Sequence, residues 1–333
     1  MTTKEGAIMG AEEGTTPDGG ADHEKAQRAR PAVTIGVPVY NGEKYLGAAL
    51  RSLAAQTWGD YEIVLCDNAS TDGTPDICRE HAARDPRIRY VRNPTNLGVL
   101  GNFDRAAALA SGEFFMWAAS DDLWEPRFVE RMVAALRANP EASLAYCNYD
   151  WVDDDARPVT RGKVRFIVDR PSPLDRVLTF NGRNPQVYNF LLYFVWRNPF
   201  LVYGMYRTEA LRRVLPFTYL FSDARHADNV FMLRFLARER VVVVDELLFH
   251  YRQKHRTSVE SMAKYQSPGQ SEPKISDRES EVERALMARV KSIIAEAPLG
   301  PVQARVLAGV VPIVGAVRFA ALTLRARWSA RRR

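Results

Sequence analysis

The sequence has few cysteines, and its first thirty residues hold no long apolar stretch. Its three thiols, Cys66, Cys78 and Cys147, are too few and too unevenly spaced for a disulfide framework or a structural zinc site. A reducing compartment is therefore expected. Residues 1–30 are polar, are interrupted by Pro17 and lack the apolar core of a secretory signal. We expect them to form a disordered leader.

Two types of glycine-rich phosphate-binding motif are also absent from the sequence. A dinucleotide-binding fold carries G-x-G-x-x-G directly after its first strand, and a P-loop carries G-x-x-x-x-G-K-[S/T]. The first predicted strand here, at 33–37, is followed by P-V-Y-N-G, and that loop holds no basic residue before Lys44. These absences count against a dinucleotide-binding enzyme and a P-loop NTPase. They also weaken a sugar-phosphate nucleotidyltransferase, whose first loop would be glycine-rich and basic.

Excess positive charge is confined to one end of the chain. The formal net charge of +6 equals the six arginines of residues 318–333, a range that contains no acid. Residues 1–317 are therefore formally neutral. A basic tail suits contact with an anionic surface better than it suits a nucleic-acid-binding face. We predict no nucleic-acid partner.

Short apolar runs alternate with helical patterns along the first half of the chain. Strands that alternate with helices in this way imply right-handed crossovers and a mostly parallel sheet flanked by helices. The sequence thus predicts an α/β fold. The strands are expected at 33–37, 61–66, 88–91 and 113–118, the helices at 43–56, 74–84 and 100–110, and further scaffold as a helix at 125–139 and strands at 143–149 and 241–244.

Polar loops follow these predicted strands, and in parallel sheets ligands bind beyond the carboxyl ends of the strands. One of the loops ends in Asp121 and Asp122. Adjacent carboxylates repel each other unless a cation lies near, and Mg²⁺ is commonly held by one or two carboxylates together with substrate phosphates. By itself the pair fits a divalent-cation site and a solvated loop before the helix near Pro126 equally well.

Four motifs in this order and spacing resemble the GT-A family 2 glycosyltransferases, from about Val33 to Ser258. The resemblance implies a GT-A fold, a nucleotide-sugar donor, a Mg²⁺ or Mn²⁺ ion and inversion at the anomeric carbon. It divides residues 31–260 into a nucleotide-sugar-binding half, 31–124, and an acceptor half, 125–260. The motifs are P-V-Y-N-G, V-L-C-D-N-A-S-T-D-G-T, N-P-T-N-L-G-V-L-G-N and A-S-G-E-F-F-M-W-A-A-S-D-D.

The same resemblance assigns the donor base to two loops. The floor beneath the base corresponds to Pro38, Tyr40, Asn41 and Glu43, for which an ordinary turn with a buried tyrosine is the alternative. Asp67 corresponds to the aspartate that accepts a hydrogen bond from the base, typically from N3 of uracil. A carboxylate accepts from that N–H and not from an unprotonated ring nitrogen, so uracil or thymine is favoured over cytosine.

The ribose, the sugar and the metal are assigned to the next two motifs. Asn96, Gly98 and Asn102 resemble the segment under the donor ribose and sugar, and Asp121 is expected nearer the ribose. Asp122 is expected to be the direct metal ligand. Many members have a further acid where this chain has Ala119, so the metal is expected to be held largely through the diphosphate.

Inversion needs a base that removes the acceptor's proton. The resemblance places it at Asp228, with Asp223 in reserve, while a helix cap is the alternative role for Asp228. Ala227 stands where the family commonly has a glutamate.

A motif near 250–258 resembles the family's Y-R-x-H-x-x-S ending. His255 is expected to reach the metal or diphosphate, assisted by Arg252 or Arg256, and His250 is expected to be structural.

The C-terminal region is predicted as a linker, 261–280, and a basic helical arm, 281–333. Residues 302–324 are strongly apolar, but two arginines and Pro312 interrupt them. They therefore lack the run of about 20 apolar residues of a spanning helix. Two interpretations remain: an interfacial segment on anionic lipid, or an arm packed on the protein or on another subunit. Both fit a cytoplasmic enzyme, which in the first case contacts the inner face of the membrane.

The leading hypothesis is a metal-dependent hexosyl- or N-acetylhexosaminyltransferase that uses a UDP- or TDP-sugar. Its acceptor would be a hydroxyl of a saccharide, a lipid-linked molecule or a small natural product, as in cell-envelope or natural-product glycan biosynthesis. One alternative is a donor-binding scaffold or regulator in which the alanines at 119 and 227 reflect lost catalysis. The other is a sugar-phosphate nucleotidyltransferase.

Overall fold

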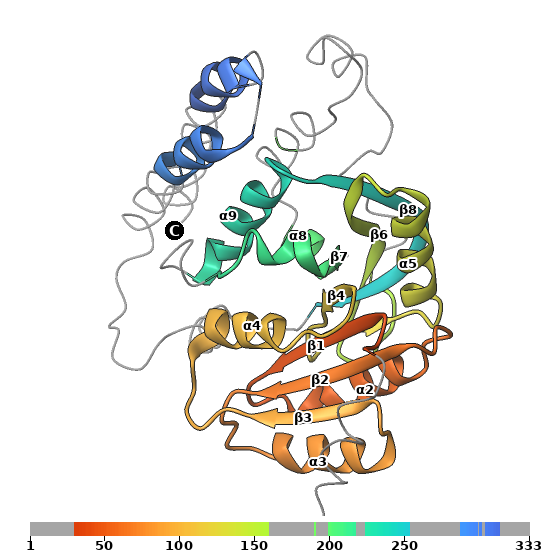
Figure 1. The fold of residues 1–333 in the computed structure, drawn as a ribbon. Helices are drawn as coiled ribbons and strands as arrows, with labels where there is room; N and C mark the ends of the chain where they lie inside the picture. The colour runs from red at the N-terminus through yellow and green to blue at the C-terminus, as the bar shows by residue number, and fades with distance from the viewer. Residues whose placement is uncertain are drawn as a thin grey trace, which may run out of the picture. The chain divides into compact units, whose positions relative to one another are not determined.

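The computed structural model describes residues 30–159, 190, 199–217, 224–253, 287–298, 300, 301 and 304–313. The chain divides into Met1–Arg30 and Pro31–Arg333, and the fold below belongs to the second unit. Figure 1 shows its sheet with helices on both faces, as expected for an α/β fold.

The described strands form one eight-stranded sheet with the order β3-β2-β1-β4-β7-β6-β8-β5. The first four strands along the chain pair in parallel, whereas β7 is antiparallel to β4 and β6, β8 is parallel to β6, and β5 is antiparallel to β8. The strands are β1 (Val33–Val39), β2 (Tyr61–Asp67), β3 (Ile88–Arg92), β4 (Phe114–Trp117), β5 (Leu123–Trp124), β6 (Ala142–Val152), β7 (Met205–Arg207) and β8 (Arg240–Arg252).

These directions bring the carboxyl ends of β1, β2, β3, β4, β6 and β8 to a single edge of the sheet. The loop from Ala118 to Asp122 leaves β4 at that edge and continues into β5, where Leu123 pairs with His250 of β8. The polar loops identified in the sequence therefore meet at the edge where parallel sheets bind ligands.

Amphipathic helices cover both faces of the sheet. In α2, the apolar residues at helical spacing, Leu46, Ala49, Leu50 and Leu53, are all fully buried. Helix α2 contacts α3 on one face, and α4 contacts α9 on the other. The helices are α2 (Glu43–Ala54), α3 (Thr74–Arg84), α4 (Gly98–Ala108), α5 (Phe128–Ala138), α8 (Thr208–Arg212), α9 (Ala224–Leu236) and the 3₁₀ helix η1 (Pro199–Tyr203).

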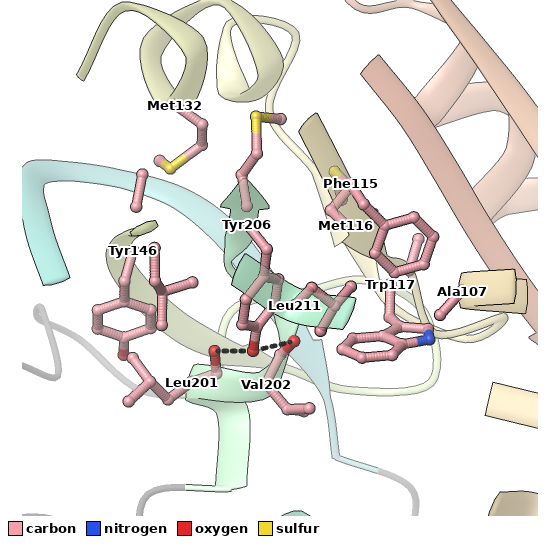
Figure 2. Close-up of a cluster of buried hydrophobic side chains, with 14 of the residues drawn as sticks. Ala107, Phe115, Met116, Trp117, Met132, Tyr146, Leu201, Val202, Tyr206 and Leu211 are labelled. Atoms are coloured by element: carbon pink, nitrogen blue, oxygen red, sulfur yellow. Dashed lines mark hydrogen bonds between the residues drawn. The ribbon is translucent and has the colours of Figure 1, made fainter. Parts of the chain in front are cut away.

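An aromatic cluster around Trp117 joins β4 to α4 and α9. The Trp117 ring is fully buried and meets Phe231 of α9 edge-on at 5.6 Å and Phe217 at 5.2 Å. Its indole N–H donates to the carbonyl of Phe103 in α4 at 3.0 Å. Figure 2 shows Trp117 beside Phe115 and, across the cluster, Tyr206, whose hydroxyl donates to the carbonyls of Leu201 and Val202.

Several strands run further than the sequence pattern predicts. Strand β1 continues through Pro38 to Val39, because β4 ends opposite Gly36 and only β2 pairs with β1 beyond that point. Strand β8 continues to Arg252, although Asp245 and Glu246 interrupt its apolar run. Asp245 accepts the Asn148 amide at 2.9 Å and Glu246 accepts Arg131 Nε at 2.7 Å, so both carboxylates have partners. The two-residue strand β5 was not predicted.

The described part of the C-terminal arm is helical at 287–296 and 304–313. Val290, Ile293, Leu307 and Val311 are buried there. Arg238, just after α9, donates to the carbonyl of Glu296 at 3.0 Å. Within the described ranges, no helix combines the length and the apolar character that crossing a membrane requires.

Candidate active site at the carboxyl edge of the sheet

Hydrogen bonds join the loops that follow β1 and β2. Asn41 has a φ of 49°, accepts the N–H of Thr71 on Oδ1 at 2.9 Å and donates its own N–H to Ser70 Oγ at 3.0 Å. Glu43 Oε2 accepts the N–H of Gly73 at 2.7 Å. These two predicted donor-site residues therefore face the second loop and fix its path.

The other two predicted residues of the first loop differ in exposure. Pro38 is buried within β1, opposite Cys66. The Tyr40 side chain is 38% exposed at the carboxyl edge of the sheet. Tyr40 thus offers an aromatic surface on which a base could stack, whereas Pro38 supports the strand.

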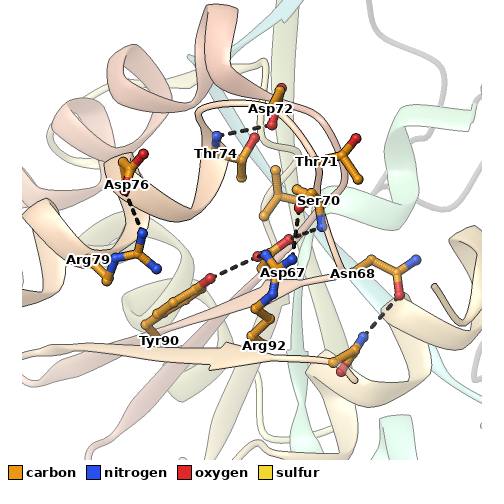
Figure 3. Close-up of polar contacts among 12 residues, drawn as sticks. Asp67, Asn68, Ser70, Thr71, Asp72, Thr74, Asp76, Arg79, Tyr90 and Arg92 are labelled. Carbon is orange, nitrogen blue, oxygen red and sulfur yellow. Dashed lines mark hydrogen bonds and ion pairs between the residues drawn. The ribbon is translucent and has the colours of Figure 1, made fainter. Parts of the chain in front are cut away.

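Asp67 ends β2 and its side chain is fully buried. Figure 3 shows it beside Ser70, Tyr90 and Arg92. Asp67 accepts the N–H of Ser70 at 2.9 Å and the hydroxyl of Tyr90 at 2.8 Å, and it forms an ion pair with Arg92. Tyr90 and Arg92 were not predicted as site residues. The sequence did hold a signal for them, because alternation along β3 places both on one face and the register pairs Arg92 with Asp67.

The environment of Asp67 favours its ionised form. Burial by itself would raise the pKa of Asp67, but the hydrogen bonds from Ser70, Tyr90 and Arg92 outweigh it and lower the pKa below its ordinary value. A carboxylate offers about four lone-pair sites. The Ser70 backbone and side chain, Tyr90 and Arg92 already supply four donors to Asp67, so a ring N–H of a base would have to take the place of one of them.

Four asparagines form a hydrogen-bonded network beneath these loops. Asn93 Nδ2 donates to Oδ1 of Asn68 and of Asn102, each at 3.0 Å. Asn68 Nδ2 donates to Asn96 Oδ1 at 2.7 Å, and Asn102 Nδ2 donates to the carbonyl of Cys66 at 2.8 Å. The network links the ends of β2 and β3 to α4. Asn68 and Asn93 were missed from the sequence, since amides in a turn-rich stretch look like ordinary turn formers.

The predicted ribose segment belongs to this network. Asn102 is buried, at 3% exposure, and its amide is bonded within the protein. Gly98 has a φ of 75°, which favours glycine, and its N–H donates to Asn96 Oδ1 at 2.8 Å. Asn96 and Asn102 therefore hold the start of α4 against the strand ends.

The two predicted acids of the third loop lie against the end of β8. Asp122 is fully buried, and its Oδ1 accepts the backbone N–H of Arg252 at 2.9 Å. The carbonyl of Asp121 accepts Arg252 Nε at 2.8 Å. Arg252 is itself only 3% exposed and bonds backbone carbonyls. In this structure Arg252 thus bonds the protein's own backbone, and its expected assistance at a diphosphate stays a prediction.

The donor set at this edge suits a metal held by few protein ligands. Across the part of the chain that the structure describes, no three His, Cys, Asp or Glu side chains gather as a complete metal site would. Asp122 and Asp121 nevertheless supply hard oxygen ligands beside the strand ends. One or two carboxylates completed by substrate phosphates is the arrangement that Mg²⁺ commonly adopts, so these residues fit such an ion. His255 lies outside the described residues.

Asp228 is the fifth residue of α9. It lies inside the helix, which does not suit the alternative role of a helix cap. Asp228 is partly exposed, and its Oδ1 accepts the backbone N–H of Asn229 at 2.7 Å and the Asn229 amide at 3.0 Å. Three residues later, Phe231 packs on Trp117 of β4. The helix that carries Asp228 is thereby anchored to the strand that leads to Asp121 and Asp122, whereas Asp223 and Arg256 fall outside the described ranges.

His250 joins three strands and has the structural role expected for it. Its Nδ1 lies 2.5 Å from Asp150 Oδ1 of β6, and its Nε2 lies 2.8 Å from Glu125 Oε1, just after β5. Asp150 and His250 are also paired in the register of β6 and β8. This contact fixes β5, and with it the loop that carries Asp122, to the end of β8.

Residues 34–215, more than half of the chain, match the model of glycosyl transferase family 2. The chain belongs to this family, as the four motifs indicated. The putative glycosyltransferase EpsH of Bacillus subtilis is 30% identical over 227 residues, which cover 67% of this chain and 61% of EpsH. The glucosyltransferase WfgD of Escherichia coli is 31% identical over 124 residues, 37% of this chain and 48% of WfgD. The chain thus spans about three fifths of EpsH and about half of WfgD.

Solved structures show the same fold. The S. aureus TarS 1–349 structures in complex with UDP-GlcNAc and with UDP superpose with TM-scores of 0.58 and 0.56, each at 19% identity. Each covers 82% of this chain, and the match covers 69% and 68% of the respective TarS chains. The fold is therefore GT-A, as the sequence predicted.

Proposed function

We propose that this chain is an inverting glycosyltransferase that moves a sugar from a UDP- or TDP-sugar to a hydroxyl group. The observation that carries the proposal is the convergence of Asp67, Asp121 and Asp122 at the carboxyl edge of a sheet in a family 2 chain. The names of similar proteins support the donor class. WfgD is described as a UDP-Glc-dependent glucosyltransferase, and TarS was solved with UDP-GlcNAc.

The donor is assigned to the loops after β1 to β4. Asp67 accepts the ring N–H of uracil or thymine in exchange for one of its protein donors, while the partly exposed Tyr40 faces the base. Asp122 and Asp121, with His255, would hold a Mg²⁺ or Mn²⁺ ion together with the diphosphate oxygens. When bound, such an ion supplies positive charge that stabilises the departing diphosphate.

The transfer itself is a single displacement in which Asp228 is the general base. Its carboxylate accepts the proton of the acceptor hydroxyl as the acceptor oxygen bonds to the anomeric carbon. The bond from that carbon to the diphosphate oxygen breaks on the opposite face, so configuration inverts. The acceptor is a saccharide, a lipid-linked molecule or a small natural product, bound on the side of β6, β8 and α9.

The variant Asp228→Asn tests this proposal. It is expected to bind a UDP- or TDP-sugar with Mn²⁺ as the wild type does, because the donor contacts lie on other elements. Its kcat is expected to fall by about 10²- to 10⁴-fold, the usual contribution of a general base. Donor binding is measured as thermal stabilisation by a panel of UDP-, TDP- and GDP-sugars, with and without Mn²⁺, and turnover as release of nucleoside diphosphate.

Two control variants accompany it. Asp223→Asn should retain turnover, and Asp122→Asn should lose the metal-dependent part of donor binding. Unimpaired turnover in Asp228→Asn would remove its assignment as base. A wild type that binds donor but transfers no sugar would support the scaffold alternative, for which Ala119 and Ala227 in place of acids are the supporting observation. Consumption of a nucleoside triphosphate would instead identify a nucleotidyltransferase.

A further inference from the structure

Arg252 makes several contacts around the two predicted metal carboxylates. Its backbone N–H donates a hydrogen bond to Asp122 Oδ1 at 2.9 Å, and its Nε donates to the carbonyl of Asp121 at 2.8 Å. Its Nη1 donates to the carbonyls of Asp153 at 2.8 Å and Asp154 at 2.6 Å. One guanidinium therefore bonds the loop after β4 and the turn after β6 at the same time.

The turn after β6, residues 153–157, is held in one shape. Asp153 N–H donates to the carbonyl of Arg157 at 2.9 Å, and Asp153 Oδ1 accepts the N–H groups of Asp155 at 2.9 Å and Arg157 at 2.8 Å. Ala156 has a φ of 64°, and Val152 and Pro158 form an isolated bridge. The turn is thus a fixed anchor for the guanidinium.

A second contact attaches the same turn to α2. Lys44 Nζ forms an ion pair with Asp154 Oδ2 at 2.8 Å. The Arg252 guanidinium lies 4.9 Å from the centre of the Tyr45 ring, and Lys44 Nζ lies 4.7 Å from it. The ring limits the directions that the guanidinium can take.

The chemistry explains why an arginine is needed at this place. The carbonyls of Asp121, Asp153 and Asp154 point their negative ends toward one small region, next to the buried Asp122 carboxylate. Mutual repulsion would separate them without a cation that donates in several fixed directions. A planar guanidinium does so, whereas a lysine ammonium is a compact charge without fixed directions.

We propose that Arg252 is a positioning residue for the transfer reaction: its guanidinium fixes the Asp121–Asp122 turn and thereby directs the Asp122 carboxylate toward the metal. The inference rests on the proposed function, because it takes Asp122 as the metal ligand. Arg252 touches neither substrate nor metal in this role. It links Asp122 to the turn at residues 153–157, which lies within the predicted acceptor half.

The test compares Arg252→Gln and Arg252→Lys with Arg207→Gln, a matched control. Arg207 also donates to two backbone carbonyls, those of Leu136 at 2.6 Å and Ala142 at 2.9 Å, and lies 5.5 Å from an aromatic ring, that of Phe114. It stands opposite Phe114, at the start of β4 and away from the site. Both glutamine variants leave carbonyls without a donor, so both should lose thermal stability.

The readout is the Mn²⁺ concentration that gives half-maximal UDP binding, measured by calorimetry beside metal-free UDP binding. Arg252→Gln is expected to raise the Mn²⁺ midpoint about tenfold or more, as loss of outer-sphere support commonly does, with metal-free binding unchanged. Arg252→Lys should recover only a small part of that loss, since it keeps the charge but not the fixed directions of the guanidinium. Arg207→Gln should leave the midpoint unchanged.

Equal Mn²⁺ midpoints in folded Arg252→Gln and Arg207→Gln would overturn the inference. Should Arg252→Gln fail to fold, Tyr45→Leu removes only the ring beside the guanidinium. It is expected to raise the midpoint in the same direction, by a smaller factor, and an unchanged midpoint there would also overturn the inference. The proposed function is read separately, on the wild type, where UDP binding without any metal dependence would contradict the metal-linked function and this inference with it.

Discussion

At the scale of single residues, Asp67 is a buried charge in the loop proposed to bind the donor. Its carboxylate is buried and takes donors from Ser70, Tyr90 and Arg92, which together lower its pKa despite burial. A carboxyl group whose pKa is lower in the folded than in the unfolded protein stabilises the fold above the unfolded pKa of about 3.9. That stabilisation is lost as the pH falls through the folded pKa.

Asp67→Asn is expected to lower the free energy of unfolding at pH 7 by about 2 kcal/mol, because hydrogen bonds to an ionised group are lost. The difference from the wild type should shrink as the pH falls below about 4, because the carboxyl of the unfolded chain takes up its proton there while the folded one, with its lower pKa, is still ionised. Urea unfolding at several pH values between 7 and 3 measures it.

The matched control for Asp67 is Asp76→Asn. Asp76 pairs with Arg79 on the surface, where its side chain is 82% exposed. An exposed pair contributes about 0–1 kcal/mol, so this variant should stay close to the wild type at each pH. A difference for Asp67→Asn that stays the same size from pH 7 to pH 3 would contradict the assigned role of its charge.

At the scale of elements, α9 and β4 are coupled through the aromatic cluster around Trp117. The Asp228 helix is positioned by Phe231 against Trp117, and Trp117 directly precedes the loop to Asp122. The indole also bonds the carbonyl of Phe103 in α4. A change at Trp117 should therefore alter both stability and the geometry of catalysis.

Trp117→Ala is expected to lower the free energy of unfolding by about 3–5 kcal/mol, the usual cost of emptying a buried aromatic site. Trp117→Phe should lower it by about 1–3 kcal/mol, because the Phe103 carbonyl loses its donor. Chemical denaturation measures both. In folded Trp117→Phe, kcat should fall more than donor affinity, since α9 moves relative to the donor loops.

The control for the indole is Trp58→Phe. Trp58 Nε1 also donates to a backbone carbonyl, that of Asp60 at 3.1 Å, but this bond is exposed to solvent and the ring is only partly buried. Its removal should change stability by about 0.5 kcal/mol or less. If Trp58→Phe and Trp117→Phe destabilise equally, the cluster does not have the role given to it here.

The elements of the first half followed from local pattern, while those of the second depended on pairing. The helix predicted at 74–84 matches α3, because its apolar spacing and its start at Thr74–Pro75 are local signals. Strand β5 has two residues and exists only through its pairing with β8. Asp245 and Glu246 break the apolar run of β8, so its full length depends on partners in β6 and α5.

The residues of the candidate site likewise divide into those that a local pattern predicts and those that depend on strand pairing. Asp67, Asp121 and Asp122 follow strands and could be found as acids at strand ends. Tyr90 and Arg92 became site residues through the register of β3 with β2. Arg252 was named from the motif near 250–258, but its contacts with Asp121 and Asp122 exist because β8 runs beside β5, a tertiary arrangement that no local pattern specifies.

At the scale of the whole molecule, the reactivity of the three cysteines depends on how tightly the interior is packed. All are free and buried. Burial raises the pKa of the Cys66 and Cys78 thiols to about 12 and raises that of Cys147 as well. The thiolate, which is the reactive form, is therefore scarce at neutral pH, and reagent reaches the sulfur only when the surrounding strands open.

A thiol reagent at pH 8 is expected to modify none of the three cysteines of the native protein on the timescale of minutes and all three after denaturation. Absorbance of the released chromophore measures the count. Val159→Cys is the positive control, because Val159 is 52% exposed and an added thiol there should react at once. A native cysteine that reacts as fast as that added thiol would show an opening of the sheet that the packing does not predict.

The asparagine network beneath the donor loops has one further consequence for the whole edge of the sheet. Asn68, Asn93, Asn96 and Asn102 join the loops through neutral amides. Amide groups neither gain nor lose protons under ordinary solution conditions, and contacts between uncharged groups are not screened by ions as charge pairs are. This amide network should therefore be insensitive to acidity and to salt. A donor affinity that changes with either one reports on the charged contacts of the loops, such as Asp67 with Arg92, and on the charges of the ligand, rather than on the asparagine network.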